Sequence, residues 1–254
     1  MRPNVDDPGR LIAHRGASRA APENTLSAVA AAAAQGVWWI EFDVSLLGDG
    51  TPVIHHDETL DRCTTWTGSI ASLEAGDLPG IFAGRGHGPA FASEPLPTLD
   101  QMLDLLGSLD FHANLEIKRH DQPLGAVSEK VAKALVARPW TQRGIIVSSF
   151  DLDELAALRR LMPNQPIAGL WTRPPPDWRA HLDALNAAAL HLNFREISRS
   201  LLAEAASFGF DVRVYTINEP RVMVAFRELG LTGVITDHPP LFQEDQDWAD
   251  WSES

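Results

Sequence analysis

The chain has 254 residues, which is close to the ~250 of one (β/α)8 barrel and also fits two small domains. Hydrophobic residues make up 44% and charged residues 22%, as in an ordinary soluble globular protein. The net charge of −13 makes nucleic acid and anionic membranes unfavourable partners, and the single cysteine, Cys63, excludes an intrachain disulfide.

The N-terminal segment MRPNVDDPGR has no apolar run of the kind found in secretion signals. No stretch of the chain approaches the ~18 consecutive apolar residues that cross a bilayer. We therefore expect a cytoplasmic protein without a membrane span, and no pattern fixes its oligomeric state.

Strand-like and helix-like segments alternate along most of the chain. The predicted strands are Leu11–Ala13, Val37–Val44, Phe111–Lys118, Gly144–Ser148, Ile167–Trp171, Ala188–Leu192, Val212–Thr216 and Gly233–Thr236. The helical patterns between them are Thr25–Gln35, Leu124–Ala137, Leu152–Leu161, Trp178–Leu185, Ser200–Phe208 and Arg221–Leu229. This alternation implies an α/β fold with a parallel sheet. At this length a closed (β/α)8 TIM barrel is the first choice, and an open doubly wound sheet is the second.

One segment breaks the alternation after the second strand. From about Gly48 to Pro97 the chain is rich in Gly, Pro, Ser and Thr, with one short strand-like run at Thr51–His56. We expect a small inserted subdomain at residues 48–97 that partly covers the top of a single barrel domain, residues 10–242. Residues 243–254 form an acidic tail, whose Trp248 and Trp251 suggest that it docks onto another part of the protein.

Polar residues gather at the ends of the predicted strands, where barrel enzymes carry their active sites. Glu41 and Asp43 are two residues apart on one strand, so both side chains point to the same face. Two carboxylates in one barrel mouth are costly unless a hard divalent cation such as Mg²⁺ or Ca²⁺ neutralises them. Glu116 on the neighbouring strand is the natural third ligand. The alternative is that these acids are solvated or pair with nearby basic residues.

Four basic side chains accompany these acids. His14 and His56 are candidates for a general acid and a general base, although a lone histidine is more often structural. Arg15 suits bidentate binding of a phosphate, or else a salt bridge to Glu41 or Glu23. Lys118 suits a phosphate oxygen, or else a pair with Glu116. Asn24 and Thr25 are good N-caps for the first predicted helix.

An ordered set of short blocks resembles the glycerophosphodiester phosphodiesterase family, from Ile12 to Pro239. The blocks are His14-Arg15-Gly16, Pro22-Glu23-Asn24-Thr25, Ile40-Glu41-Phe42-Asp43, His56-Asp57, Leu115-Glu116-Ile117-Lys118, Ser148-Ser149-Phe150, Tyr215-Thr216-Ile217-Asn218 and Gly233-Val234-Ile235-Thr236-Asp237. Each block alone is weak, but the ordered set is specific. His191-Leu192-Asn193 is similar to the bacterial cytoplasmic branch, which works beside glycerol 3-phosphate uptake.

The resemblance implies metal-dependent hydrolysis of small glycerophosphodiesters to sn-glycerol 3-phosphate and an alcohol. It implies the following roles: His14 as base, His56 as acid, Glu41, Asp43 and Glu116 as cation ligands, and Arg15 and Lys118 on the phosphate. Phe150 and Tyr215 would line the glycerol side. The attacking oxygen could be water or a neighbouring glycerol hydroxyl. The chain departs from the family pattern in two places. Cys63-Thr64-Thr65-Trp66 stands where Thr, Thr or Ser, Asn, Gly is usual, and Tyr215 stands where many relatives have tryptophan.

Two other functions fit the residues less well. One is a related barrel phosphodiesterase that acts on phosphoinositide- or sphingomyelin-type substrates, which the acidic charge and the lack of a membrane-binding segment disfavour. The other is a non-catalytic ligand-binding barrel, which would be expected to have lost a histidine or a cation ligand.

Overall fold

The protein folds as a closed parallel barrel. The computed structural model describes residues 9–223, 226–245 and 248. Its parallel strands are β1 (Leu11–His14), β2 (Trp39–Leu46), β4 (His112–Ile117), β5 (Ile145–Ser149), β6 (Ile167–Trp171), β7 (Ala189–Asn193), β8 (Asp211–Tyr215) and β9 (Gly233–Thr236). β1 pairs with β9 on one side and with β2 on the other, which closes the ring. The predicted TIM barrel is confirmed, and the doubly wound alternative is wrong.

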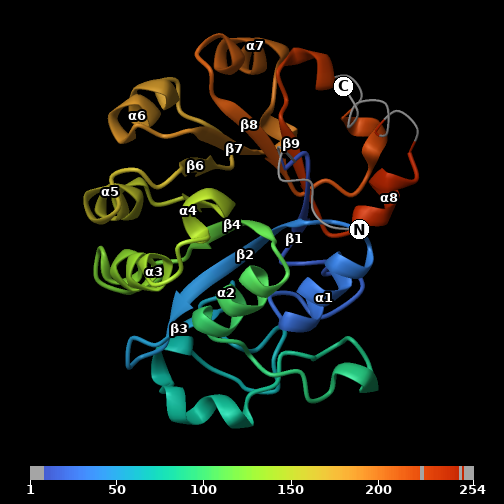
Figure 1. Ribbon diagram of the computed structural model, residues 1–254, viewed down its shortest axis with the longest axis vertical. Coiled ribbons are helices and arrows are strands. Elements are labelled where there is room, and N and C mark those ends of the chain that lie inside the picture. The colour runs from blue at the N-terminus through green and yellow to red at the C-terminus, as the bar shows by residue number, and fades with distance from the viewer. Residues whose placement is uncertain (1–8, 224–225, 246–247, 249–254) are drawn as a thin grey trace.

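Helices surround this ring in Figure 1. They are α1 (Leu26–Ala34), α2 (Leu99–Ser108), α3 (Ala126–Val136), α4 (Thr141–Gly144), α5 (Leu152–Leu161), α6 (Trp178–Leu185), α7 (Arg199–Ser207) and α8 (Pro239–Gln243). The Ala-rich α1 begins as expected at Thr25, whose side chain accepts a hydrogen bond from the Ala28 amide. The predicted helix Arg221–Leu229 is wrong at both ends, where the chain forms 3-10 turns at Pro220–Val222 and Arg227–Leu229; residues 224–225 lie outside the described part.

Strand alternation separates the packing core from the barrel interior. On β2, Ile40, Phe42 and Val44 are fully buried in the cluster that the surrounding helices share. The residues between them, Glu41 and Asp43, therefore face the interior. A second apolar cluster, which includes Ile12 and Ile235, fills the barrel below them. The fold thus places two carboxylates above an apolar floor.

The segment between β2 and α2 forms its own small unit, drawn in teal beside β3 and α2 in Figure 1. Strand β3 (Pro52–Ile54) pairs antiparallel with the end of β2, and 3-10 turns follow at Ile70–Ser72, Ala75–Gly80 and Pro89–Phe91. Its apolar side chains pack in a separate buried cluster that includes Leu60 and Ile81. The domain limits, residues 10–242 with an insertion at about 48–97, stay a prediction.

One described residue near the C-terminus, Trp248, packs back onto the barrel domain. Trp248 is buried, and its ring meets Phe242 edge to face at 5.0 Å between centroids. Trp251, the other tryptophan of the acidic tail, lies outside the described residues. Within the described part, no helix combines the length and apolar character needed to cross a bilayer.

Candidate active site

Three buried carboxylates meet inside the barrel mouth. Glu41 and Asp43 come from β2 and Glu116 from β4, and Asp43 is the register partner of Glu116. One oxygen from each lies within 4.8 Å of the others. Burial raises the pKa of Glu41, and the charges of Asp43 and Glu116 raise it further. The same two causes, burial and Asp43, raise the pKa of Glu116 to about 7. Without a cation these groups compete for protons.

Two cationic side chains lie against the shared carboxylate of Asp43. Lys118 Nζ is 3.3 Å from Asp43 Oδ1 and forms an ion pair with Glu116. Arg15 Nε is 3.3 Å from Asp43 Oδ2, while its Nη1 donates to Glu23 Oε1 at 2.6 Å. Burial acts to raise the pKa of Asp43, but Lys118 and Arg15 outweigh it, and the pKa is lowered. The ion pairs that the sequence offered as alternatives, Lys118 with Glu116 and Arg15 with Glu23, are therefore present in the structure.

The donor set fits a hard divalent cation. Glu41 Oε1 and Asn114 Oδ1 are buried, and neither has a hydrogen-bond partner among the residues that the structure describes. Both residues line a small cavity of about 20 Å³, together with His14 and Glu116. Buried oxygens without partners are costly, and Mg²⁺ and Ca²⁺ take oxygen ligands. Glu41, Asp43 and Glu116 could hold such an ion with the carboxylate geometry described.

The histidine at the end of β1 is paired with a carboxylate from the far end of the chain. His14 Nδ1 is 2.6 Å from Asp237 Oδ1, and His14 Nε2 is 3.8 Å from Glu41 Oε2. Asp237 also accepts from Asn218 Nδ2 at 2.9 Å and from Ser18 Oγ at 3.3 Å. Although burial opposes it, the His14 hydrogen bond lowers the pKa of Asp237 to about 2. An ionised carboxylate only accepts, so Nδ1 carries a proton and Nε2 faces the acids.

The second histidine has the same kind of partner. His56 follows β3, and its Nδ1 is 2.6 Å from Asp57 Oδ1. Asp57 Oδ2 accepts from Arg62 Nε at 2.6 Å, and despite partial burial these bonds lower the pKa of Asp57 to about 2. Burial lowers the pKa of His56, although the Asp43 charge raises it. The hydrogen bond to Asp57 therefore fixes the orientation of the His56 ring and places a proton on its Nδ1.

Sequence reasoning assigned no role to three of these partners. Asp57 and Asp237 stood inside the recognised blocks, and Asn24 was interpreted only as a helix cap. Asn24 donates to Asp43 Oδ2 at 2.8 Å and accepts from the Asp43 amide at 3.1 Å. The adjacency of His56 and Asp57 was a readable signal, whereas nothing local marks Asp237 as the partner of His14.

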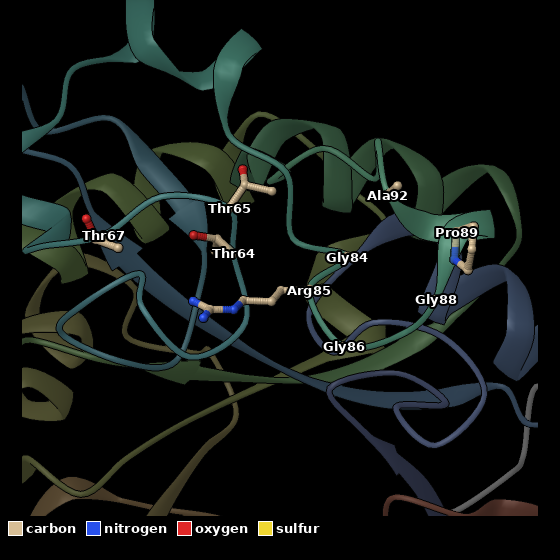
Figure 2. Close-up of a pocket in the computed structure, with 9 residues that line it drawn as sticks. All are labelled: Thr64, Thr65, Thr67, Gly84, Arg85, Gly86, Gly88, Pro89 and Ala92. Atoms are coloured by element: carbon tan, nitrogen blue, oxygen red, sulfur yellow. The ribbon is translucent and has the colours of Figure 1, made fainter.

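Aromatic residues lie beside the charged groups. Phe150 and Tyr215 meet edge to face with 6.1 Å between centroids, and Lys118 Nζ is 5.5 Å from the Phe150 ring centre. Tyr215 also borders a pocket of about 460 Å³ that Phe194 and Asn218 line. Another pocket, of about 770 Å³, lies in the segment after β3 and contains none of the predicted site residues, as Figure 2 shows. The mouth thus offers polar and apolar surfaces side by side.

Comparison with known proteins identifies the family of this chain. Residues 14–241 match the Glycerophosphoryl diester phosphodiesterase family. A glycerophosphodiester phosphodiesterase of Caldanaerobacter subterraneus subsp. tengcongensis is 33% identical over 230 residues, which cover 90% of this chain and 94% of that protein. The solved structure of an Oleispira antarctica phosphodiesterase in complex with the product sn-glycerol-3-phosphate is 30% identical, with a TM-score of 0.83 over 95% of this chain and 96% of that one. An Agrobacterium tumefaciens glycerophosphodiester phosphodiesterase is 26% identical, with a TM-score of 0.78 over 92% of this chain and 98% of that one.

The family match covers the strand ends that carry the paired histidines and the three-carboxylate cluster. Fold, order of motifs and relatives point the same way, so the resemblance read from the sequence is confirmed. The chain belongs to the glycerophosphoryl diester phosphodiesterase family and is a phosphodiesterase of that kind.

Proposed function

We propose that the protein hydrolyses glycerophosphodiesters to sn-glycerol 3-phosphate and an alcohol, with a divalent cation and two histidines. The observation that carries the proposal is the pair of His–Asp dyads, His14–Asp237 and His56–Asp57, around the three-carboxylate cluster. The Oleispira antarctica relative was solved with sn-glycerol-3-phosphate as its product, which supports a small-molecule substrate of this class.

The charges at the mouth explain why a cation is needed. Within the described part of the chain, the three carboxylates of Glu41, Asp43 and Glu116 pair with two cationic side chains, Arg15 and Lys118, so an anionic diester would meet surplus negative charge. Glu41, Asp43 and Glu116 would hold Mg²⁺ or Ca²⁺, and the charge of the bound ion would serve to polarise a phosphoryl oxygen. Arg15 and Lys118 then bind the remaining phosphoryl oxygens and stabilise charge there in the transition state.

The two histidines divide the proton transfers. Asp237 holds the proton on His14 Nδ1, which leaves Nε2 to take a proton from the attacking oxygen. That oxygen belongs to water or to the neighbouring glycerol hydroxyl of the substrate. Asp57 holds His56 in the same way, so that its Nε2 gives a proton to the leaving alcohol. Phe150 and Tyr215 line the glycerol side and exclude water from it.

The direct test is release of glycerol 3-phosphate from glycerophosphocholine, with and without EDTA. We expect activity that EDTA abolishes and that added Mg²⁺ or Ca²⁺ restores. His14→Ala should lose turnover by about 10²-fold or more with the fold unchanged by circular dichroism. Near-normal activity of His14→Ala, or of the EDTA-treated protein, contradicts the proposal. Preference for intact phosphoinositide or sphingomyelin over deacylated diesters would instead favour the related phosphodiesterase.

A further inference from the structure

A second group of metal-ligating side chains lies next to the histidine of β3. His55, Asp57 and Cys63 each offer a ligand atom, and these atoms lie within 4.8 Å of one another. Ligand atoms around a tetrahedral ion are about 3.3–3.8 Å apart, given metal–ligand distances of 2.0–2.3 Å. A shift of roughly an ångström would therefore bring the three atoms to coordinating distance.

The chemistry of this donor set differs from that of the inner carboxylates. Imidazole, carboxylate and thiol together suit Zn²⁺, which accepts nitrogen, oxygen and sulfur ligands. Mg²⁺ and Ca²⁺ prefer oxygen alone and would remain at Glu41, Asp43 and Glu116. The described part of the chain therefore holds two clusters that select different cations.

One ring nitrogen of His55 is already fixed by a backbone carbonyl. It is 2% exposed, and its Nε2 lies 2.9 Å from the carbonyl oxygen of Thr59. A carbonyl oxygen only accepts, so Nε2 carries the proton and Nδ1 keeps its lone pair. Ligating histidines in metal sites typically donate their second N–H to such a carbonyl or carboxylate, which fixes the tautomer. Burial also lowers the pKa of His55, which favours the neutral form that a metal requires.

Cys63 supplies the third ligand, and its thiolate would help to balance the charge of a bound Zn²⁺ ion. Burial, together with the nearby Glu23 carboxylate, raises the pKa of the Cys63 thiol to about 11. Zn²⁺ displaces the thiol proton to solvent as the zinc–sulfur bond forms. The ion then faces one thiolate and one carboxylate, Asp57, whose charges balance its own. Water can take the fourth position, as it does in open zinc sites.

The site shares Asp57 with the proposed catalytic machinery. Asp57 Oδ1 receives the His56 Nδ1 proton, and Oδ2 receives Arg62 Nε. A cation bound to Asp57 competes with both bonds. Arg62 would remain paired, because two further bonds of 2.6 and 2.7 Å hold it to Glu23. His56 has no such substitute among the contacts of the described residues, so it would lose the partner that orients it.

We propose that His55, Asp57 and Cys63 form a Zn²⁺ site, and that its occupation inhibits the enzyme by withdrawing Asp57 from His56. The inhibitory half of this inference rests on the proposed function, whereas the binding half stands without it.

Binding is tested with Co²⁺, which takes the same ligands as Zn²⁺ and is coloured. The protein is held in excess Mg²⁺ so that the inner carboxylates are filled. Because Cys63 is the single cysteine of the chain, a thiolate-to-cobalt charge-transfer band in the near ultraviolet must come from it. We expect this band in the wild type, its loss when Zn²⁺ is added, and its absence in Cys63→Ser. A wild type without the band overturns the site.

Inhibition is tested by titrating Zn²⁺ at constant Mg²⁺ in the wild type, Cys63→Ser and Cys63→Thr. Cys63 belongs neither to the inner carboxylate cluster nor to the two His–Asp dyads, so both variants should keep basal activity. Loss of one ligand should raise the inhibitory midpoint by at least about tenfold. If the three proteins lose activity at the same Zn²⁺ concentration, occupation of the Cys63 site does not cause the inhibition. Zn²⁺ that replaces Mg²⁺ at the inner carboxylates would affect all three proteins equally. A wild type inactive on every diester would defeat the proposed function, while the cobalt band still decides the site.

Discussion

The two His–Asp dyads should respond differently to the quality of the leaving group. Asp237→Asn weakens the partner of His14, the proposed base, and Asp57→Asn weakens the partner of His56, the proposed acid. An acid is needed only when the departing alkoxide is a poor leaving group. A substrate that releases 4-nitrophenol should therefore tolerate Asp57→Asn but not Asp237→Asn.

The size of the Asp237→Asn effect follows from its contacts. The pKa of Asp237 falls from 3.8 to about 2, which corresponds to about 2.5 kcal/mol at ~1.4 kcal/mol per unit. Its side chain is 36% exposed, so solvent screening reduces this to roughly 1–2 kcal/mol. Where the carboxylate gives this energy to the imidazolium that His14 becomes in the transition state, its loss corresponds to about a 5- to 30-fold fall in kcat. An amide also has one acceptor oxygen for three donors, namely His14, Ser18 and Asn218.

The assay compares kcat for glycerophosphocholine and for the 4-nitrophenyl ester of glycerol 3-phosphate in the wild type and both variants. Asp237→Asn should lower both rates by the same factor, whereas Asp57→Asn should lower only the rate with choline. The reverse pattern would exchange the roles of His14 and His56. Unchanged rates in both variants would refute the argument that these carboxylates position the catalytic histidines.

Three further predictions concern stability. The pKa of Glu116 is about 7 in the folded protein instead of 4.5, so the folded state binds the Glu116 proton more tightly than the unfolded state does. The free energy of unfolding that this group contributes is therefore present below pH 4.5 and is lost as the pH rises through 7. Mg²⁺ binds the ionised form, so EDTA should lower the Tm more at about pH 8 than at about pH 5.5, and equal shifts would contradict the assignment. Glu154→Ala should lower the free energy of unfolding by about 2–4 kcal/mol, because buried Glu154 accepts a hydrogen bond from Ser128 Oγ at 2.6 Å. Urea denaturation measures this loss, and kcat should be retained. A loss under ~0.5 kcal/mol would contradict the prediction. Gly84→Ala should lower the melting temperature, because a Cβ at this position would lie 1.7 Å from a backbone oxygen. Gly76→Ala is the matched control, because a Cβ there meets nothing within 4 Å. Equal melting temperatures of the two variants would show that the loop around Gly84 adjusts.

Most of the barrel was predictable because its signals are local. Short apolar runs at the correct spacing marked every barrel strand to within one or two residues. Helix α2 was missed next to the Gly- and Pro-rich segment, although Thr98 and Gln101 form a capping box that the sequence displays. The predicted helix at residues 221–229 is bounded by Pro220 and Gly230, residues that favour turns over long helices.

The candidate site was predictable only in part. Strand alternation was enough to bring Glu41 and Asp43 to one face, and the ion pair of Arg15 with Glu23 was one of two alternatives considered. The partner of His14 was not predictable from local pattern, because it is defined by the pairing of β1 with β9. Contacts that depend on ring closure have no signature in neighbouring residues.

The bond between His14 and Asp237 joins residues 223 positions apart in the chain. During synthesis, a nascent chain that ends before β9 holds the proposed cation ligands and both histidines but lacks the carboxylate that is paired with His14. Hydrolytic competence should therefore arise late, when the last strand docks beside the first. Fragments produced by premature termination or proteolysis of the C-terminal segment would be poor catalysts even where the remaining strands persist.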